Sequence, residues 1–211
     1  MIIKLDGNVE RHNNEESLNM RCPSCRQLGS FKSLLSECIR KHTGQQLIFL
    51  GHRVCPNEDC LAHVFIVWDS DRNIMISYPP ELLDFDSSNI PPNIINIFEE
   101  ALICHANKTF IASAIMVRRT LEELCNDKSA QGENLKEKII ALGNKVIIPS
   151  ELLEGLDNLR LLGNDAAHVE AQIYQNIGKE EVELAIDVTK EVLKAVYQYA
   201  SLVKRLNDLK K

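Results

Sequence analysis

The sequence predicts an α+β protein in two parts, with a small β-rich module over residues 1–90 and an α-helical bundle over residues 91–211. Three observations support this prediction. The first part contains short runs rich in β-branched and aromatic residues, with two close pairs of cysteines beside them. Prolines then interrupt the chain between Tyr78 and Pro92, a composition typical of a linker. Beyond them, apolar residues recur at helical spacing to the end of the chain.

The two cysteine pairs are the strongest chemical signal in the chain. Cys22 and Cys25 have two residues between them, whereas Cys55 and Cys60 have four. A proline inside each pair favours the tight turn that brings both sulfurs to one point. Two such pairs supply the four ligands of a tetrahedral Zn²⁺ site, which has no open position and would support folding rather than catalysis. A redox-active Cys-x-x-Cys pair and unliganded thiols are the two alternatives.

Three runs near the second cysteine pair are rich in β-forming residues, and they predict the hairpins of a zinc ribbon. In such a ribbon the cysteine turns lie at hairpin tips. His52 and His63 are expected on strands near the metal and not as ligands, and Trp68 is expected in the core. An exposed Trp68 that stacks on a nucleic-acid base is the alternative. The predicted strands cover residues 46–54, 61–68 and 73–78.

Residues 31–43 are expected to form a helix between the two cysteine pairs. On that helix Cys38 and His42 would be four residues apart, so they are an alternative pair of metal ligands. Ordinary packing and surface exposure are the other explanation for these two residues.

The apolar pattern of the second part predicts helices over residues 94–106, 108–126 and 135–142, with breaks near Asn107 and at Gly143. A further helix is expected from Pro149, and a long last helix from Gly178 to about Leu209. The last helix carries apolar residues at alternating steps of three and four, which is typical of a bundle or coiled-coil seam. The seam consists of Val182, Ala185, Thr189, Val192, Val196, Tyr199, Val203 and Leu206.

Charge and composition narrow the classes of function. The net charge of −6 argues against broad electrostatic coating of nucleic acid, although a local basic cleft is compatible with it. No stretch approaches the length of apolar sequence that a membrane helix needs, and the N-terminus has no signal-peptide pattern. Seven cysteines, an odd number with metal-type spacing, fit a reducing compartment. We therefore expect a cytoplasmic protein.

Chemistry-bearing side chains concentrate in one segment of the second part, Arg-Leu-Leu-Gly-Asn-Asp-Ala-Ala-His at residues 160–168. On a continuous helix Arg160, Asn164 and His168 would form a polar strip, because each step of four rotates by only about 40°. Arginine can hold a phosphate through two hydrogen bonds, and histidine can transfer protons near neutral pH. These are parts for metal-independent cleavage of RNA by its own 2′-hydroxyl. A simple helix end at Gly163 is the alternative.

Several of these motifs together resemble a widespread prokaryotic family of unknown function that joins a zinc-ribbon-like segment to an HEPN-like helical bundle. The resemblance covers most of the chain. The motifs are RCPSC at 21–25, CPNEDC at 55–60, YPPE at 78–81, IMVRRTLEELC at 115–125 and RLLGNDAAH at 160–168.

The resemblance implies a short up-and-down bundle that forms a homodimer. Many HEPN proteins are metal-independent endoribonucleases of toxin–antitoxin and antiviral defence systems, with an arginine and a histidine near the dimer cleft. By this resemblance Arg160 and His168 would be catalytic, Asn164 would orient them, and RNA would be the substrate. An antitoxin or a defence complex would be the partner. The seven residues between Arg160 and His168 exceed the usual spacing, and a non-catalytic dimeric module that recognises a protein, nucleotide or nucleic acid is the alternative.

Arg118 and Arg119 are candidate substrate-binding residues, because they could add positive potential for a phosphate beside the Arg160 segment. The competing explanation is a pair of ordinary helix-surface ion pairs, Arg118 with Glu122 and Arg119 with Glu123, each four residues apart.

Overall fold

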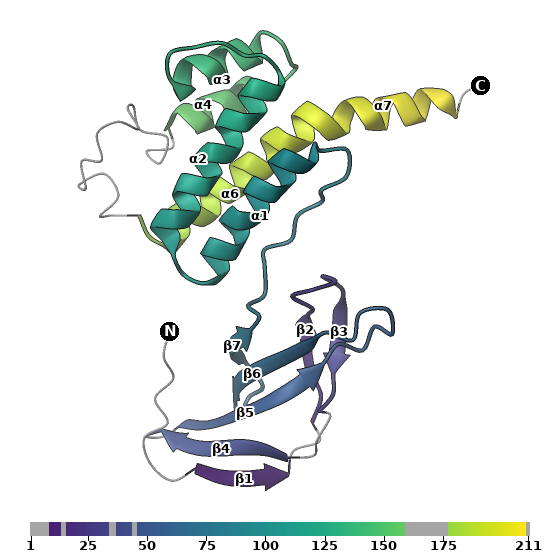
Figure 1. Ribbon diagram of the computed structural model, residues 1–211, viewed down its shortest axis with the longest axis vertical. Helices are drawn as coiled ribbons and strands as arrows, with labels where there is room; N and C mark the ends of the chain where they lie inside the picture. Colours follow the sequence, from purple (N-terminus) through teal and green to yellow (C-terminus); the bar gives the residue numbers. More distant parts are fainter. Residues whose placement is uncertain (1–8, 14–15, 34–36, 44–45, 159–176, 210–211) are drawn as a thin grey trace. The chain divides into compact units, whose positions relative to one another are not determined.

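The computed structural model describes residues 9–13, 16–33, 37–43, 46–158 and 177–209. The chain divides into two units, Met1–Leu82 and Leu83–Lys211. The first unit is built of antiparallel strands and the second of helices, so the prediction of an α+β protein is confirmed (Figure 1). The boundary between the two units lies before residue 90, the last residue of the predicted first part, because Phe85 and Ile90 pack into the core of the helical unit.

The first unit contains a five-stranded antiparallel sheet in the order β1-β4-β5-β6-β7 and a separate hairpin, β2–β3. The strands predicted around the second cysteine pair are present. The bounds are β1 Val9–Asn13, β2 Leu18–Arg21, β3 Leu28–Phe31, β4 Glu37–Thr43, β5 Gln46–Val54, β6 His63–Asp69 and β7 Ile74–Tyr78.

The prediction of a helix over residues 31–43 is wrong. Phe31 ends β3, and the later part of this segment is strand β4, which lies between β1 and β5. The residues of β4 pair with Val9–Asn13 on one side and with Gln46–Leu50 on the other. These hydrogen bonds come from distant parts of the chain, and they override the local helical pattern.

The core of the first unit lies between the sheet and the β2–β3 hairpin. Alternate residues of β6 point into it, and Trp68 at the end of this row is fully buried. Phe49 stacks on Trp68, and the guanidinium carbon of the buried Arg53 lies 4.5 Å from the centroid of the Trp68 ring. Trp68 is therefore a core residue and cannot stack on a base. The core residues are Leu18, Met20, Cys22, Phe31, Cys55, Val64, Ile66 and Trp68.

The helical unit is built around α1, α2 and α6, which pack against one another. Helix α1 spans Pro92–Ala106 and α2 spans Phe110–Asp127, so the chain breaks near Asn107 as predicted. Pro92 lies in the first turn of α1, where its missing N–H costs nothing. Helices α3 (Leu135–Gly143) and α4 (Ser150–Asn158) pack against α2 and α6 respectively.

Helix α3 stops at Gly143, as predicted, and Gly143 also has a role in packing. It is the last residue of α3, with Asn144 as the cap. A Cβ atom at Gly143 would lie 2.7 Å from Cδ1 of Leu153, so the missing side chain permits the close approach of α3 and α4. At the other end of α3, the Asn134 side chain accepts a hydrogen bond from the Glu137 N–H at 3.0 Å.

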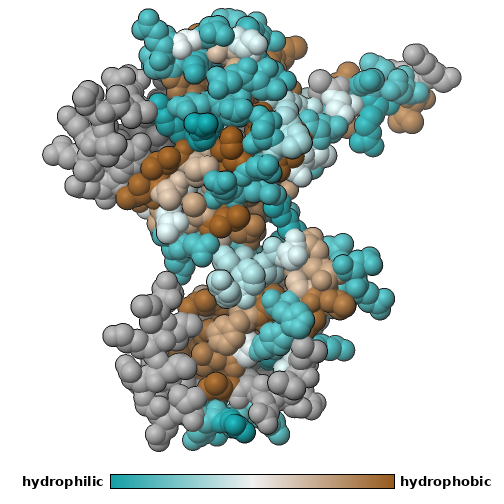
Figure 2. Space-filling view, in the orientation of Figure 1, coloured by the Kyte–Doolittle hydropathy of each residue, from teal (hydrophilic) through white to brown (hydrophobic). Residues whose placement is uncertain are grey.

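The last helix is continuous in the chain but has three segments: α6 (Lys179–Leu193), a π-helical turn η2 (Lys194–Gln198) and α7 (Tyr199–Asp208). The predicted seam divides along it. Its first five members, from Val182 to Val196, are buried, whereas Tyr199, Val203 and Leu206 are exposed. Figure 1 shows that α7 projects beyond the other helices of its unit, and Figure 2 shows hydrophobic residues on it. None of the described helices is long and apolar enough to cross a membrane.

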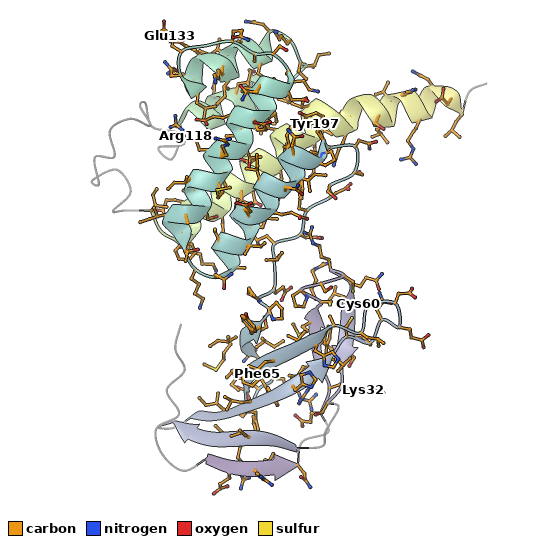
Figure 3. All side chains as sticks on the ribbon, viewed as in Figure 1. Lys32, Cys60, Phe65, Arg118, Glu133 and Tyr197 are labelled. Carbon is orange, nitrogen blue, oxygen red and sulfur yellow. The ribbon has the colours of Figure 1, made fainter. Side chains whose placement is uncertain are left out.

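A partly buried hydrogen bond ties the end of α2 to the π-helical turn. The Tyr197 hydroxyl donates to Oδ2 of Asp127 at 2.7 Å (Figure 3). Nζ of Lys128 lies 4.2 Å from the centroid of the Tyr197 ring and 2.9 Å from the same Asp127 oxygen. Burial raises the pKa of Tyr197, so the hydroxyl remains a donor at neutral pH.

We predict that Tyr197→Phe lowers the free energy of unfolding of the helical unit by about 1 kcal/mol, because Asp127 loses a hydrogen-bond donor in a partly buried position. Urea denaturation followed by helical circular dichroism measures it. Tyr199→Phe is the matched control, since the Tyr199 side chain is 50% exposed. Equal effects of the two substitutions would contradict the prediction.

Candidate metal centre

The four predicted metal ligands lie at the tips of two hairpins. Cys22 and Cys25 occupy the turn between β2 and β3, and Cys55 and Cys60 occupy the turn between β5 and β6. The arrangement fits a zinc ribbon, as the spacing predicted. Adjacent strands of a hairpin are held in register, so each turn presents its two sulfurs on a rigid base.

Backbone hydrogen bonds shape the first cysteine turn (residues 22–26). The Cys22 N–H donates to the Gln27 carbonyl at 2.9 Å, and the Arg26 N–H donates to the Cys22 carbonyl at 3.0 Å. The Ser24 N–H points at the Cys22 sulfur, with 3.4 Å between N and Sγ. Arg26 closes the turn with φ of 62°, in the left-handed region. Backbone donors of this kind orient a thiolate and stabilise its charge.

The second cysteine turn (residues 55–61) is longer but ends in the same way. The Asn57 carbonyl accepts hydrogen bonds from the N–H groups of Cys60 and Leu61, each at 3.0 Å. The Asn57 side chain also accepts one from the Asp59 N–H at 3.0 Å. Leu61 has φ of 47°, so in both turns the residue directly after the second cysteine is left-handed. The hydrogen bonds to Asn57 thus shape a turn that accommodates the two extra residues between Cys55 and Cys60.

Gly29 lets the two hairpins meet. A Cβ atom at this position would lie 2.5 Å from Cγ of Pro56, the proline of the second cysteine turn. A side chain on β3 would therefore push the second turn away from the first. The sequence alone gives no signal for Gly29 or for the left-handed Arg26 and Leu61, because only the fold determines which parts of the backbone lie close together.

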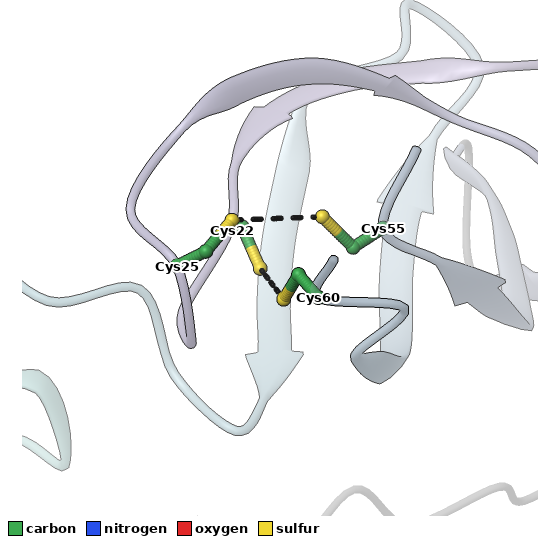
Figure 4. A group of neighbouring side chains, drawn as sticks. All are labelled: Cys22, Cys25, Cys55 and Cys60. Carbon is green, nitrogen blue, oxygen red and sulfur yellow. Dashed lines mark hydrogen bonds between the residues drawn. The ribbon is translucent and has the colours of Figure 1, made fainter. Parts of the chain in front are cut away.

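The four sulfurs converge on one point (Figure 4). The Sγ atoms of Cys22 and Cys60 are 3.8 Å apart, those of Cys25 and Cys55 are 3.7 Å apart, and all four lie within 4.8 Å of one another. A tetrahedron has edges about 1.63 times its centre-to-corner distance, so sulfurs at about 2.3 Å from a Zn²⁺ are about 3.8 Å apart. The observed separations fit a tetrahedral metal ion and exclude a disulfide.

The environment of the sulfurs suits a cation. Cys22 and Cys55 are buried, and burial raises the pKa of both thiols, that of Cys55 to about 12. The backbone N–H of Gln27 lowers the pKa of Cys25 to about 7. Burial disfavours bare thiolates, whereas a bound metal ion supplies the compensating charge and deprotonates the thiols. These four cysteines can therefore hold a metal ion.

No other group of three or more metal-ligating side chains converges in this way among the residues that the structure describes. His52 and His63 lie on β5 and β6, as expected, and stack on each other. Cys38 and His42 belong to β4 rather than to a helix, and their side chains lie outside the described part of the structure.

The candidate RNA-binding arginines differ in their surroundings. Nε of Arg118 lies 3.0 Å from Oε1 of Glu122, and the Arg118 side chain is only 12% exposed. Arg119 is exposed, and Glu123 accepts instead from Nδ2 of Asn93 at 2.8 Å. Of the two ion pairs predicted between residues four apart, the pair of Arg118 with Glu122 is therefore present. The candidate catalytic residues are outside the described residues; they are Arg160, Asn164 and His168.

Comparison with known proteins gives one family. A family model described as a domain of unknown function, DUF4145, matches residues 99–209, from within α1 to the residue after α7. No curated protein and no solved structure matches the chain. The matched residues make up more than half of the chain and lie wholly in the helical unit. The chain therefore belongs to the DUF4145 family.

Proposed function

We propose that the protein is an RNA-directed, cytoplasmic homodimer of HEPN type, whose first unit is held together by Zn²⁺ and whose helical unit cleaves RNA without a metal. One observation carries the proposal. The converging cysteines would satisfy a tetrahedral ion completely, which leaves no position for a substrate or a water. Cleavage must then use other side chains, and the segment at residues 160–168 supplies the types that metal-free cleavage needs.

Zn²⁺ is the ion that we assign to the cysteines. Four thiolates in tetrahedral geometry suit zinc or iron, and both sulfur separations match the edge expected for Zn–S bonds. Each hairpin contributes two ligands, so the ion would link them and contribute to folding.

We predict one zinc ion per chain in freshly purified protein, measured by elemental analysis. Cys22→Ser should lose the metal and unfold the first unit, because metal binding at such sites is worth on the order of 10 kcal/mol. Cys104→Ser is the matched control, since Cys104 lies on α1 outside the cluster and should keep the metal. Protein without zinc, or with iron in its place, would overturn the assignment.

In the proposed reaction the 2′-hydroxyl of a ribose attacks the adjacent phosphorus. A new bond forms between the 2′-oxygen and phosphorus, and the bond to the 5′-oxygen of the next nucleotide breaks. His168 takes the proton of the 2′-hydroxyl or delivers one to the leaving 5′-oxygen. Arg160 stabilises the charge that develops on the phosphate, and Asn164 orients one or both. Arg119, exposed on α2, and Arg118 beside it would bind phosphates of the substrate.

We predict cleavage of RNA in buffer with EDTA, leaving 2′,3′-cyclic phosphate ends, with DNA of the same sequence intact. His168→Ala and Arg160→Ala should each slow cleavage by about a hundredfold or more. Arg119→Ala should instead act mainly on KM, because a binding contact is made equally before and during the reaction. Gel electrophoresis and end-group analysis measure these effects.

If the wild type and His168→Ala both leave diverse RNAs intact, the catalytic proposal fails. The second candidate, a non-catalytic dimeric module that recognises a protein, nucleotide or nucleic acid, would then replace it. The observation that favours this candidate is the ion pair of Arg118 with Glu122, which neutralises one of the two proposed phosphate ligands. In either role an antitoxin or a defence complex would be the partner.

The proposed dimer contact is the apolar stripe of α7. Tyr199, Leu202, Val203 and Leu206 recur at steps of three and four and are each at least half exposed. A stripe of this kind is stabilised by packing against a second helix. A second copy of the chain offers the same stripe, so the contact can be closed by two-fold symmetry.

Light scattering at micromolar concentration should give about twice the chain mass of 23.9 kDa. Leu206→Glu should convert the dimer to a monomer, because it places a charge in the apolar contact. Lys204→Glu also adds an acid to α7, but about half a turn away from the stripe, and should leave the dimer intact. A monomer at all concentrations would contradict the proposal.

A further inference from the structure

Three rings form a row across the outer face of the ribbon sheet, the face turned away from its core. His52 of β5 pairs with Phe65 of β6, and Phe65 pairs with Tyr78 of β7. Residues directly opposite each other in an antiparallel sheet project from the same face. The row therefore crosses the strands, with about 4.8 Å between neighbouring strands.

Two rings of this row, those of Phe65 and Tyr78, are open to solvent. Phe65 is 43% exposed and Tyr78 is 71% exposed, whereas the neighbouring Val64 and Ile66 are fully buried on the inner face. Burial of Phe65 and Tyr78 would be favourable, yet the fold keeps both apolar rings at the surface. Exposed aromatic rings on a flat sheet are the construction by which proteins stack the bases of single strands.

A fourth ring and a cation complete the surface. His63 stacks on His52 with 4.8 Å between the ring centroids, and Nδ1 of His63 lies 2.9 Å from Nε2 of His52. Lys32 is exposed and is joined by a β-bridge to Val54, the residue that pairs with His63. Lys32 therefore stands on the same face as Val54 and His63. Figure 3 labels Lys32 and Phe65.

Lys32 and the carboxylate of this face lie at opposite ends of the strands. Among the described outward positions of β5, β6 and β7, the one carboxylate is Asp69, at the far end of β6 from His63. Asp69 accepts hydrogen bonds from the side chain and backbone of Asn73, at 2.9 and 2.8 Å. Among the strand positions of this face, Lys32 and the rings thus lie away from Asp69, whereas the exposed Glu58 and Asp59 lie in the turn that joins β5 to β6. Leu50 and Val67 on this face are buried, so the exposed part of the face is the row of rings. The described positions on this face are Ile48, Leu50, His52, Val54, His63, Phe65, Val67, Asp69, Ile76 and Tyr78.

We infer that the row of His52, Phe65 and Tyr78 is a stacking platform for the bases of single-stranded RNA, with Lys32 on a backbone phosphate. The inference deepens the proposed function and rests on it for the choice of RNA over other single strands. The platform uses no residue of the 160–168 segment. Binding at the platform and cleavage can therefore be tested separately.

The test uses the full-length His168→Ala chain, zinc content verified, with an unstructured fluorescent RNA of roughly ten nucleotides. Fluorescence anisotropy measures the Kd. Phe65→Ala and Tyr78→Ala should each weaken binding about 5- to 100-fold, whereas Tyr78→Phe keeps the ring and the affinity. Lys32→Ala should reduce the slope of log Kd against log salt by about one. Leu28→Ala is the matched control, because Leu28 is exposed on β3 and lies off the platform.

The platform proposal would be overturned if the chain does not bind the RNA. It would also be overturned if Phe65→Ala and Tyr78→Ala bind the RNA with the same Kd as Tyr78→Phe. A protein that binds this face in place of RNA would give that result. A DNA of the same sequence is the second probe, because the wild-type chain should bind it without cleaving it. Ring-dependent binding with RNA left intact by the wild type would support the platform and overturn the cleavage proposal. Cleavage of RNA by the wild type, together with binding that does not depend on the rings, would support the cleavage proposal and overturn the platform.

Discussion

The convergence of four sulfurs on one point is the constraint on which the first unit depends. An isolated two-stranded hairpin is at best marginally stable in water, and the core beneath this sheet is small. Among the described residues, one β-bridge links the end of this hairpin to the main sheet, between Lys32, which follows β3, and Val54. The sulfurs join its tip to the tip of β5–β6, and the contact of Gly29 with Pro56 brings the two turns within reach.

This arrangement determines which surfaces of the unit remain for function. The hairpin covers one face of the sheet and buries Trp68, so the opposite face carries the exposed rings. With a tetrahedral ion bound, the cysteines would contribute structure and leave no reactive position, because the ion would use all four. In this unit the metal and the sheet would form a rigid support, and recognition would fall to side chains on its outer face.

The helical unit follows the same separation of support and function. Helices α1, α2 and α6 bury the apolar residues that hold the bundle together, and the hydrogen bond from Tyr197 to Asp127 ties the last helix to α2. Beyond the π-helical turn the same helix leaves this core, and its apolar residues become exposed. Burial within the chain therefore stops at the π-helical turn, and the apolar stripe beyond it is the contact of the proposed dimer.

The sequence by itself determined the features that depend on neighbours in the chain. The cysteine spacing predicted the metal cluster, and local composition predicted strands β5 to β7, helices α1 to α4 and the break near Asn107. Pairing between distant segments was decided by the tertiary structure. It made residues 37–43 a strand between β1 and β5, because ladder hydrogen bonds outweigh a weak local preference. It also divided the seam of the last helix, and only the strand register brought His52, Phe65 and Tyr78 into one row.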